Sequence, residues 1–118
     1  MSGKPILVVS DDGNQSYWSS VAQKIKDQVG SLHIVLAKEV SRQHTDHMYD
    51  VVLLDVSDIE ELYLLIPEIH REQPRSRVIV VSSTPTWAMT REVIRLGASS
   101  LIRKSSNLDQ IIDELRLL

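Results

Sequence analysis

Acidic, hydroxyl and amino side chains follow the short apolar segments of this sequence. Each stands at or just beyond the end of its segment: Ser10, Asp11, Asp12, Asp55, Ser82, Ser83 and Lys104. Crowded carboxylates repel one another unless a divalent cation lies among them, and oxygen ligands with one or two carboxylates suit Mg²⁺. A carboxylate beside Mg²⁺ can attack a phosphoryl group, while a hydroxyl and an ammonium can bind the phosphoryl oxygens. These residue types are therefore suited to forming an acyl phosphate.

For these side chains to meet, the apolar segments must be parallel strands of one sheet. They are rich in β-branched residues, which is typical of strands covered on both faces: Ile6–Val9, Leu32–Ala37, Val51–Leu54, Val78–Val81 and a weaker one at Ser100–Arg103. Stretches with helical spacing follow them, the least periodic being Glu39–Met48. Five strand–helix repeats predict an α/β fold with a doubly wound, five-stranded parallel sheet, and ligands in such sheets bind beyond the carboxyl ends of the strands.

Composition excludes several classes of function. The 118 residues correspond to one domain, residues 1–118, with a net charge of −3 and no block rich in Lys and Arg, so direct nucleic-acid binding is not expected. No apolar run approaches the roughly 20 residues that cross a bilayer, and we expect no membrane association. The absence of cysteine excludes disulfides and thiol catalysis and fits a cytoplasmic location.

The ordered set of motifs resembles the receiver domain of two-component response regulators, a flavodoxin-like (βα)5 fold, over essentially the full length. Four stretches carry the resemblance: ILVVSDD at Ile6–Asp12, YDVVLLD at Tyr49–Asp55, VIVVSS at Val78–Ser83 and LGASSLIRKSS at Leu96–Ser106. The KSS ending is similar to receivers of NarL/LuxR-type regulators. Each motif alone is weak, whereas their order and separation along the chain are specific to the family.

The resemblance implies a role for each matching residue. Asp55 matches the phospho-acceptor, and Asp11 matches the direct metal ligand of the acidic pair. The backbone carbonyl of Ser57 matches the third protein ligand of Mg²⁺. Ser82 and Lys104 match the hydroxyl and the lysine that contact the phosphoryl group. We expect a signalling domain that at most catalyses its own phosphorylation and dephosphorylation.

The resemblance also implies partners. A sensor histidine kinase or a phosphotransfer protein would supply the phosphoryl group, and a downstream effector domain or protein would respond, with a homodimer as a further prediction. The family signals through its fourth helix, fifth strand and fifth helix. The residues expected on that face here are Trp87, Arg91, Arg95, Leu101 and Arg103.

Three departures from the family pattern leave an alternative open. Ser10 stands where the family has its first acid, unless a bulge lets Asp11 and Asp12 form the pair and Asp12 joins the metal site. The loop after Asp55 has neither the Pro nor the Gly of the family. Leu101 replaces the aromatic switch residue. A pseudo-receiver, which has the same fold but acts as a protein-interaction module without phosphorylation, is therefore the alternative.

An unrelated flavodoxin-like enzyme or nucleotide binder is the third hypothesis. Such proteins cradle phosphates in a glycine-rich loop at the start of a helix. The corresponding stretch here, residues 11–14, is acidic and contains one glycine. It would repel a nucleotide phosphate in the absence of a metal, so this hypothesis is the weakest.

Overall fold

The sheet has five parallel strands, as the sequence predicts. The computed structural model describes residues 5–11, 13–25, 30–39 and 48–117. The strand order is β2-β1-β3-β4-β5, and every neighbouring pair is parallel. The strands are β1 (Ile6–Ser10), β2 (Leu32–Leu36), β3 (Val51–Asp55), β4 (Arg77–Ser82) and β5 (Ser100–Arg103). The order changes direction at β1, between β2 and β3, so the carboxyl end of β1 is where a ligand site is expected.

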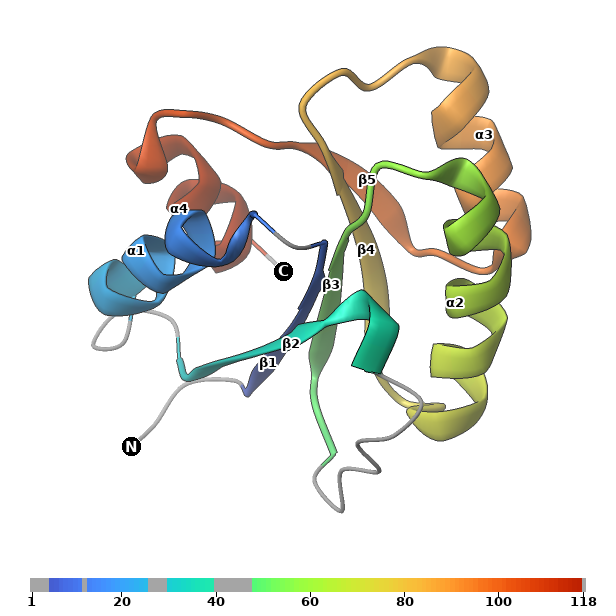
Figure 1. Ribbon diagram of the computed structural model, residues 1–118, viewed down its shortest axis with the longest axis horizontal. Helices are drawn as coiled ribbons and strands as arrows, with labels where there is room; N and C mark the ends of the chain where they lie inside the picture. Colours follow the sequence, from blue (N-terminus) through green and yellow to red (C-terminus); the bar gives the residue numbers. More distant parts are fainter. Residues whose placement is uncertain (1–4, 12, 26–29, 40–47, 118) are drawn as a thin grey trace.

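Helices cover both faces of this sheet. The α-helices are α1 (Gln15–Ile25), α2 (Ile59–Glu72), α3 (Trp87–Leu96) and α4 (Leu108–Arg116). Figure 1 shows α1 and α4 on one face and α2 and α3 on the other. A 3-10 turn, η1 (Ala37–Glu39), follows β2, and most of the helix predicted at Glu39–Met48 lies outside the described residues.

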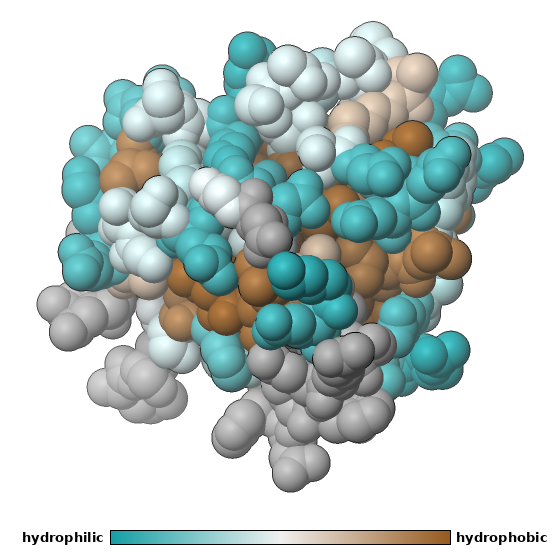
Figure 2. All heavy atoms as spheres, in the orientation of Figure 1, coloured by the Kyte–Doolittle hydropathy of each residue, from teal (hydrophilic) through white to brown (hydrophobic). Residues whose placement is uncertain are grey.

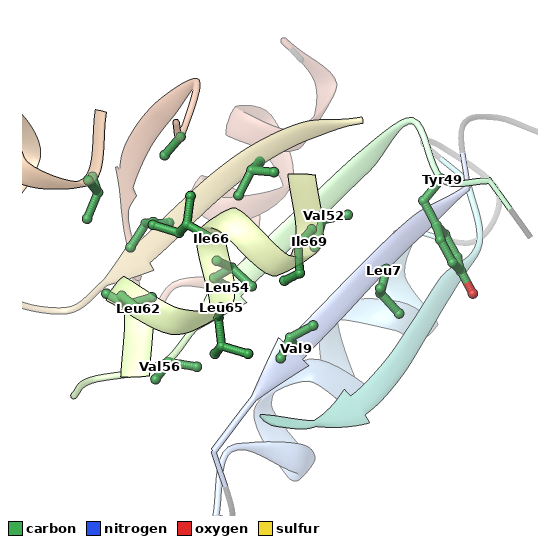
Figure 3. Close-up of a cluster of buried hydrophobic side chains, with 14 of the residues drawn as sticks. Leu7, Val9, Tyr49, Val52, Leu54, Val56, Leu62, Leu65, Ile66 and Ile69 are labelled. Atoms are coloured by element: carbon green, nitrogen blue, oxygen red, sulfur yellow. The ribbon is translucent and has the colours of Figure 1, made fainter. Parts of the chain in front are cut away.

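Alternating strand side chains divide the core into two clusters. Leu7 and Val9 face α2 and α3, whereas Ile6 and Val8 face α1 and α4. Figure 3 shows the first cluster, in which the apolar face of α2, at spacings of three and four residues, lies on the sheet. Ile66 of α2 is fully buried there, and burying such a side chain contributes roughly 1.5–3 kcal/mol. These two layers hold the strands, and hence the strand ends, in fixed positions.

Short polar residues begin three of the helices. The side chains of Asp58, Thr86 and Asn107 accept hydrogen bonds from the first-turn amides of α2, α3 and α4, as expected of N-caps. Gly97 ends α3 with a φ of 122°, and a Cβ at this position would lie 2.7 Å from the His70 ring. Glycine is therefore favoured at this helix end, where it also makes room for the packing of α2 against α3.

Three strands extend further than the apolar pattern predicts. Ser10, Asp55 and Ser82 are the last residues of β1, β3 and β4 and do not follow the strands. A polar side chain does not stop the hydrogen bonding between neighbouring strands, because these hydrogen bonds are made by backbone groups. The chain leaves all these strands at the upper edge of the sheet in Figure 1. The polar residues are therefore fixed by strand register as well as by the loops.

The surface carries some apolar side chains. Figure 2 shows hydrophobic side chains over α2 and along the edge strand β2. On α2, Leu64 is 74% exposed and Tyr63 is 41% exposed. Within the described ranges, the helices are too short and too polar to span a membrane.

Candidate functional site

Ser10 and Asp55 lie side by side at the carboxyl ends of β1 and β3. They are register partners in the parallel ladder. Their side chains continue the alternation of Val8 and Leu53, which face α1 and α4. Ser10 is fully buried and Asp55 is 6% exposed. A carboxylate so far removed from water needs a charged or hydrogen-bonding partner.

Two donors bind the Asp55 carboxylate through the same oxygen. The Lys104 ammonium lies 2.8 Å from Oδ2, with side-chain exposures of 17% for Lys104 and 9% for Asp55. The indole Nε1–H of Trp18 donates to Oδ2 as well, at 2.8 Å. Among the described residues, no side chain hydrogen-bonds to the other carboxylate oxygen of Asp55, Oδ1. The arrangement therefore compensates the buried charge while leaving one carboxylate oxygen available for chemistry.

Lys104 is held from several sides. Its ammonium donates to Asn14 Oδ1 at 3.1 Å and lies 4.6 Å from the centroid of the Tyr17 ring, a cation–π distance. The Tyr17 hydroxyl donates to the Ser105 carbonyl at 2.6 Å. The Lys104 amide donates to the Ser82 carbonyl at 2.8 Å, which joins the end of β4 to the loop after β5. The Lys104 ammonium thus has partners from the end of β3, the loop after β1 and α1, while the Lys104 backbone is tied to the end of β4.

The charge of Asp55 affects the Tyr17 phenol. Burial, first, and the nearby Asp55 carboxylate, second, raise the pKa of Tyr17 above its ordinary value of 10.0. The phenol therefore keeps its proton, and its hydrogen bond to the Ser105 carbonyl, to a higher pH than an exposed tyrosine would. Tyr17 also packs edge-on against the Trp18 ring, with centroids 5.1 Å apart.

Asp11 lies at the same edge, beside the loop that follows Asp55. Its Oδ2 accepts hydrogen bonds from the Ser57 amide at 3.1 Å and from the Ser57 hydroxyl at 3.3 Å. Its own amide donates to the Asp55 carbonyl at 3.3 Å. Partial desolvation, then the negative charges of Asp11 and Asp58, raise the pKa of Glu61 at the start of α2. Three carboxylates therefore lie near one another on this side of the site, and Lys38 lines the same pocket as Asp11 and Glu61.

The donor set at this edge fits a hard divalent cation. Among the described residues, the Ser10 hydroxyl is the one buried side-chain polar atom without a hydrogen-bond partner. It lies beside the Asp55 carboxylate, and Asp11 and the backbone of Ser57 are close by. Within the described ranges, no group of three or more acidic or histidine side chains is placed to hold a metal ion. Mg²⁺ is usually bound through only one or two carboxylates, with water and phosphate completing its shell, so this set is sufficient. Asp12, the fourth predicted ligand, lies outside the described residues.

Ser82 reaches the same edge of the sheet, but its hydroxyl has a local partner. Its Oγ accepts from the Thr84 amide at 3.2 Å. Within the described residues it makes no hydrogen bond with Asp55, whose side-chain partners there are Trp18 and Lys104. The structure thus brings Asp55 and Lys104 into contact, with Asp11 beside them, and leaves Ser82 turned toward its own loop.

The predicted output residues lie on α3 and β5. Trp87, Arg91 and Arg95 follow one another at four-residue spacing, and Trp87 is 83% exposed, so it does not complete the core. Arg103 is exposed as well. Leu101 is half-buried and packs against the cluster beneath α2 and α3.

Trp18, Tyr17 and Asn14 are described site residues that the sequence alone did not identify. Trp18 is buried on the apolar face of α1, and its N–H contacts Asp55. Asn14 immediately precedes α1, and its side chain accepts from Lys104. The one available signal was that a buried indole needs a hydrogen-bond acceptor, which an acidic strand end can provide.

Comparisons with known proteins agree with this geometry at the level of fold. No model of a protein family and no curated protein matches the sequence. Among solved structures, a CheY-like receiver domain protein from Methanospirillum hungatei is 21% identical, with a TM-score of 0.74, covering 98% of this chain and 93% of that one. A two-component response regulator from Clostridium difficile is 12% identical, with a TM-score of 0.77, covering 97% and 93%.

A third structure carries a modified acceptor. It is a response regulator from Burkholderia pseudomallei with a phosphorylated aspartic acid and a calcium ion. That protein is 18% identical, with a TM-score of 0.74; the match covers 95% of this chain but only 66% of the other. The chain has the fold of response-regulator receiver domains.

Proposed function

We propose that this chain is a phospho-acceptor receiver domain of a two-component system. Asp55 would take a phosphoryl group from the phosphohistidine of a sensor histidine kinase or a phosphotransfer protein, with Mg²⁺ bound at the carboxyl ends of β1 and β3. The phosphorylated form would signal to an effector through α3, β5 and α4. The domain is then a signalling protein in the cytoplasm and not an enzyme with an external substrate, apart from catalysis of its own phosphorylation and dephosphorylation.

The observation that carries this proposal is the buried ion pair between Asp55 and Lys104, 2.8 Å apart at the ends of two strands. Burying an ion pair is costly, and hydrophobic residues of similar volume would often be as stable. A nucleophile beside a cation at the edge where α/β sheets bind ligands is an arrangement suited to phosphoryl transfer. The adjacent Asp11 carboxylate supplies the second negative ligand that a cation needs.

In the proposed phosphoryl transfer, each side chain at the site has its own role. Asp55 Oδ1 forms the bond to phosphorus, and the bond between phosphorus and the imidazole nitrogen of the donor breaks, with the electron pair staying on that nitrogen. Lys104 neutralises the charge on the transferred group. Asp11, Asp55 and the Ser57 carbonyl would hold the cation, which, when bound, offsets phosphoryl charge. Ser82 would donate its hydroxyl hydrogen to a phosphoryl oxygen, a role that its acceptance of the Thr84 amide leaves open.

The proposed output face has no hydroxyl switch. Leu101 packs on the core and has no hydrogen-bonding group, so a response must pass through the backbone between Ser82 and Lys104, which are joined by a hydrogen bond. Trp87 and the two arginines of α3 would provide an exposed aromatic and positive charge for an effector. A homodimer through the same face is an extension of this proposal.

The second candidate is a pseudo-receiver that binds a partner without phosphorylation. Ser10 in place of an acid lowers the negative charge available to a cation. In addition, Trp18 and Lys104 already satisfy one oxygen of Asp55. Under this candidate the buried pair is structural, and the α3 face alone carries the function.

One experiment separates the two candidates. The protein is incubated with Mg²⁺ and a small phosphodonor such as acetyl phosphate, and its intact mass is measured, with the Asp55→Asn variant alongside. We expect a phosphoryl mass addition that requires Mg²⁺ and is lost in the variant. A folded parent protein that gains no mass supports the pseudo-receiver and contradicts the proposal.

A further inference from the structure

Trp18 makes a contact that core packing does not require. Its side chain is fully buried, and its Nε1–H donates to Asp55 Oδ2 at 2.8 Å. We infer that this indole N–H shortens the lifetime of phosphorylated Asp55, because it binds the free carboxylate more strongly than the acyl phosphate. The inference rests on the proposed function of Asp55, and it makes Trp18 a positioning residue that also tunes the chemistry at the acceptor.

The geometry decides which oxygen carries the phosphoryl group. Trp18 and Lys104 both contact Oδ2, and no described side chain binds Oδ1. The bond to phosphorus therefore forms at Oδ1, and Oδ2 becomes the carbonyl oxygen of the acyl phosphate. The indole then faces a neutral carbonyl where it had faced a carboxylate.

The two donors differ in their freedom to move. Trp18 belongs to the core cluster beneath α1 and α4 and is fully enclosed. Lys104 has a flexible stem, retains some exposure, and has further partners in Asn14 and the Tyr17 ring. Lys104 can follow the phosphoryl group, whereas Trp18 must stay at Oδ2 in both states.

Hydrolysis returns charge to the oxygen that Trp18 holds. Water attacks phosphorus, the bond from phosphorus to Oδ1 breaks, and its electron pair returns to the carboxylate, which shares the charge with Oδ2. The proton of the water leaves with inorganic phosphate or solvent. A hydrogen bond to a charged acceptor is roughly twice as strong as one to a neutral acceptor. The indole therefore stabilises the departing carboxylate more than the acyl phosphate, which speeds its loss.

The first test removes the donor and keeps an aromatic ring. The parent and Trp18→Phe are phosphorylated with acetyl phosphate and Mg²⁺, the donor is removed, and the decay of the phosphorylated mass is followed. We expect a lifetime about five- to tenfold longer in Trp18→Phe. Val21→Ala, a fully buried change on the same helix, removes core volume without removing a donor, and its lifetime should match that of the parent.

A second measurement leaves Trp18 in place, in case Trp18→Phe does not fold. The indole N–H resonances of Trp18 and Trp87 are recorded by NMR in the parent, in the phosphorylated parent and in Asp55→Asn. The Trp18 resonance should move on phosphorylation toward its position in Asp55→Asn. The resonance of Trp87, which is 83% exposed, identifies any general change of environment.

The outcomes separate this inference from the proposed function. A phosphorylated parent whose lifetime is unchanged in folded Trp18→Phe, or whose Trp18 resonance does not respond to phosphorylation, overturns the role of Trp18 and leaves Asp55 as the acceptor. A parent that never gains a phosphoryl mass overturns both. A lengthened lifetime in Val21→Ala equal to that in Trp18→Phe would attribute the effect to loosened packing and also overturn the inference.

Discussion

Ser10 and Asp55 are register partners on β1 and β3 and both are buried, and among the residues that the structure describes the Ser10 hydroxyl has no hydrogen-bond partner. A buried hydroxyl without a partner costs about 1–3 kcal/mol. A third group in this space, such as a cation or its bound water, would recover that cost. The pair therefore marks the part of the proposed metal site that carries the least negative charge.

Ser10→Asp should strengthen cation binding and weaken the metal-free fold. A third carboxylate adds attraction for Mg²⁺, but without the cation it lies beside Asp55 and repels it. We expect a lower midpoint in an Mg²⁺ titration followed by amide NMR, and a metal-free free energy of unfolding lower by about 1–3 kcal/mol. The neutral variant Ser10→Asn, of matched size, should not bind Mg²⁺ more tightly. Equal affinities in the parent and both variants would place the cation elsewhere.

Lys104→Met should destabilise the protein substantially. Because both members of the pair are largely buried, removing the ammonium leaves a buried carboxylate whose one remaining side-chain partner among the described residues is the Trp18 indole. We expect a loss of about 3 kcal/mol in denaturant unfolding. The double variant with Asp55→Asn should recover most of this loss, since no charge is then left unpaired. If the double variant is as unstable as Lys104→Met, the ammonium acts through packing on Tyr17 and not through Asp55.

Asp55→Asn should lower the pKa of Tyr17. Burial is the larger cause of its raised value and remains, but the carboxylate charge is removed, so the pKa should fall only part of the way to 10.0. Absorbance or NMR titration measures this. Tyr49 is the matched control, because burial alone raises its pKa.

The raised pKa of Tyr17 also predicts how the stability of the fold changes with pH. Folding favours the protonated phenol of Tyr17, so its contribution to stability is complete below pH 10 and is lost as the pH rises through the raised value in the folded state. Replacement by phenylalanine in Tyr17→Phe should therefore flatten the alkaline part of the stability curve. An unchanged alkaline slope would mean that the phenol is as free in the folded chain as in the unfolded one.

Gly97→Ala should be more harmful than Gly13→Ala. Both glycines have a positive φ, 122° and 94°, which disfavours any side chain. At Gly97 the new Cβ would also meet the His70 ring at 2.7 Å, whereas at Gly13 nothing lies within 4 Å. We expect losses of about 2–3 kcal/mol and about 1 kcal/mol in chemical unfolding. Equal losses would show that His70 gives way without cost.

The fold was predictable because its signals are local and repeated. Continuous β-branched runs such as Val51–Leu54 indicate buried parallel strands, and Gly97 indicates the end of a helix. The ion pair of Asp55 with Lys104 follows from two strand ends meeting at one edge. Strand register decides which side chains of neighbouring strands lie next to each other on one face of the sheet. Here it pairs Ser10 with Asp55 as the last residues of β1 and β3, whereas the apolar pattern ends both strands one residue earlier.

The contact between Trp18 and Asp55 could not be predicted in the same way. The contact depends on the position of α1 relative to the end of β3. That position is set by the packing of the helix on the sheet and cannot be read from the spacing of residues in the sequence. The apolar pattern places Trp18 in the core and contains no information on where its one polar atom points. The hydrogen bond from Thr84 to Ser82 is likewise a property of the loop conformation.

The identity of the phosphorylated residue is the most direct test of the account. After incubation with acetyl phosphate and Mg²⁺, the protein is treated with borohydride, which reduces an aspartyl phosphate to homoserine, and its peptides are mapped by mass spectrometry. We predict homoserine at position 55 and at no other aspartate, with none formed when Mg²⁺ is withheld. Modification at Asp11 instead, or a folded protein with no modified aspartate, would contradict the assignment of Asp55 as the acceptor.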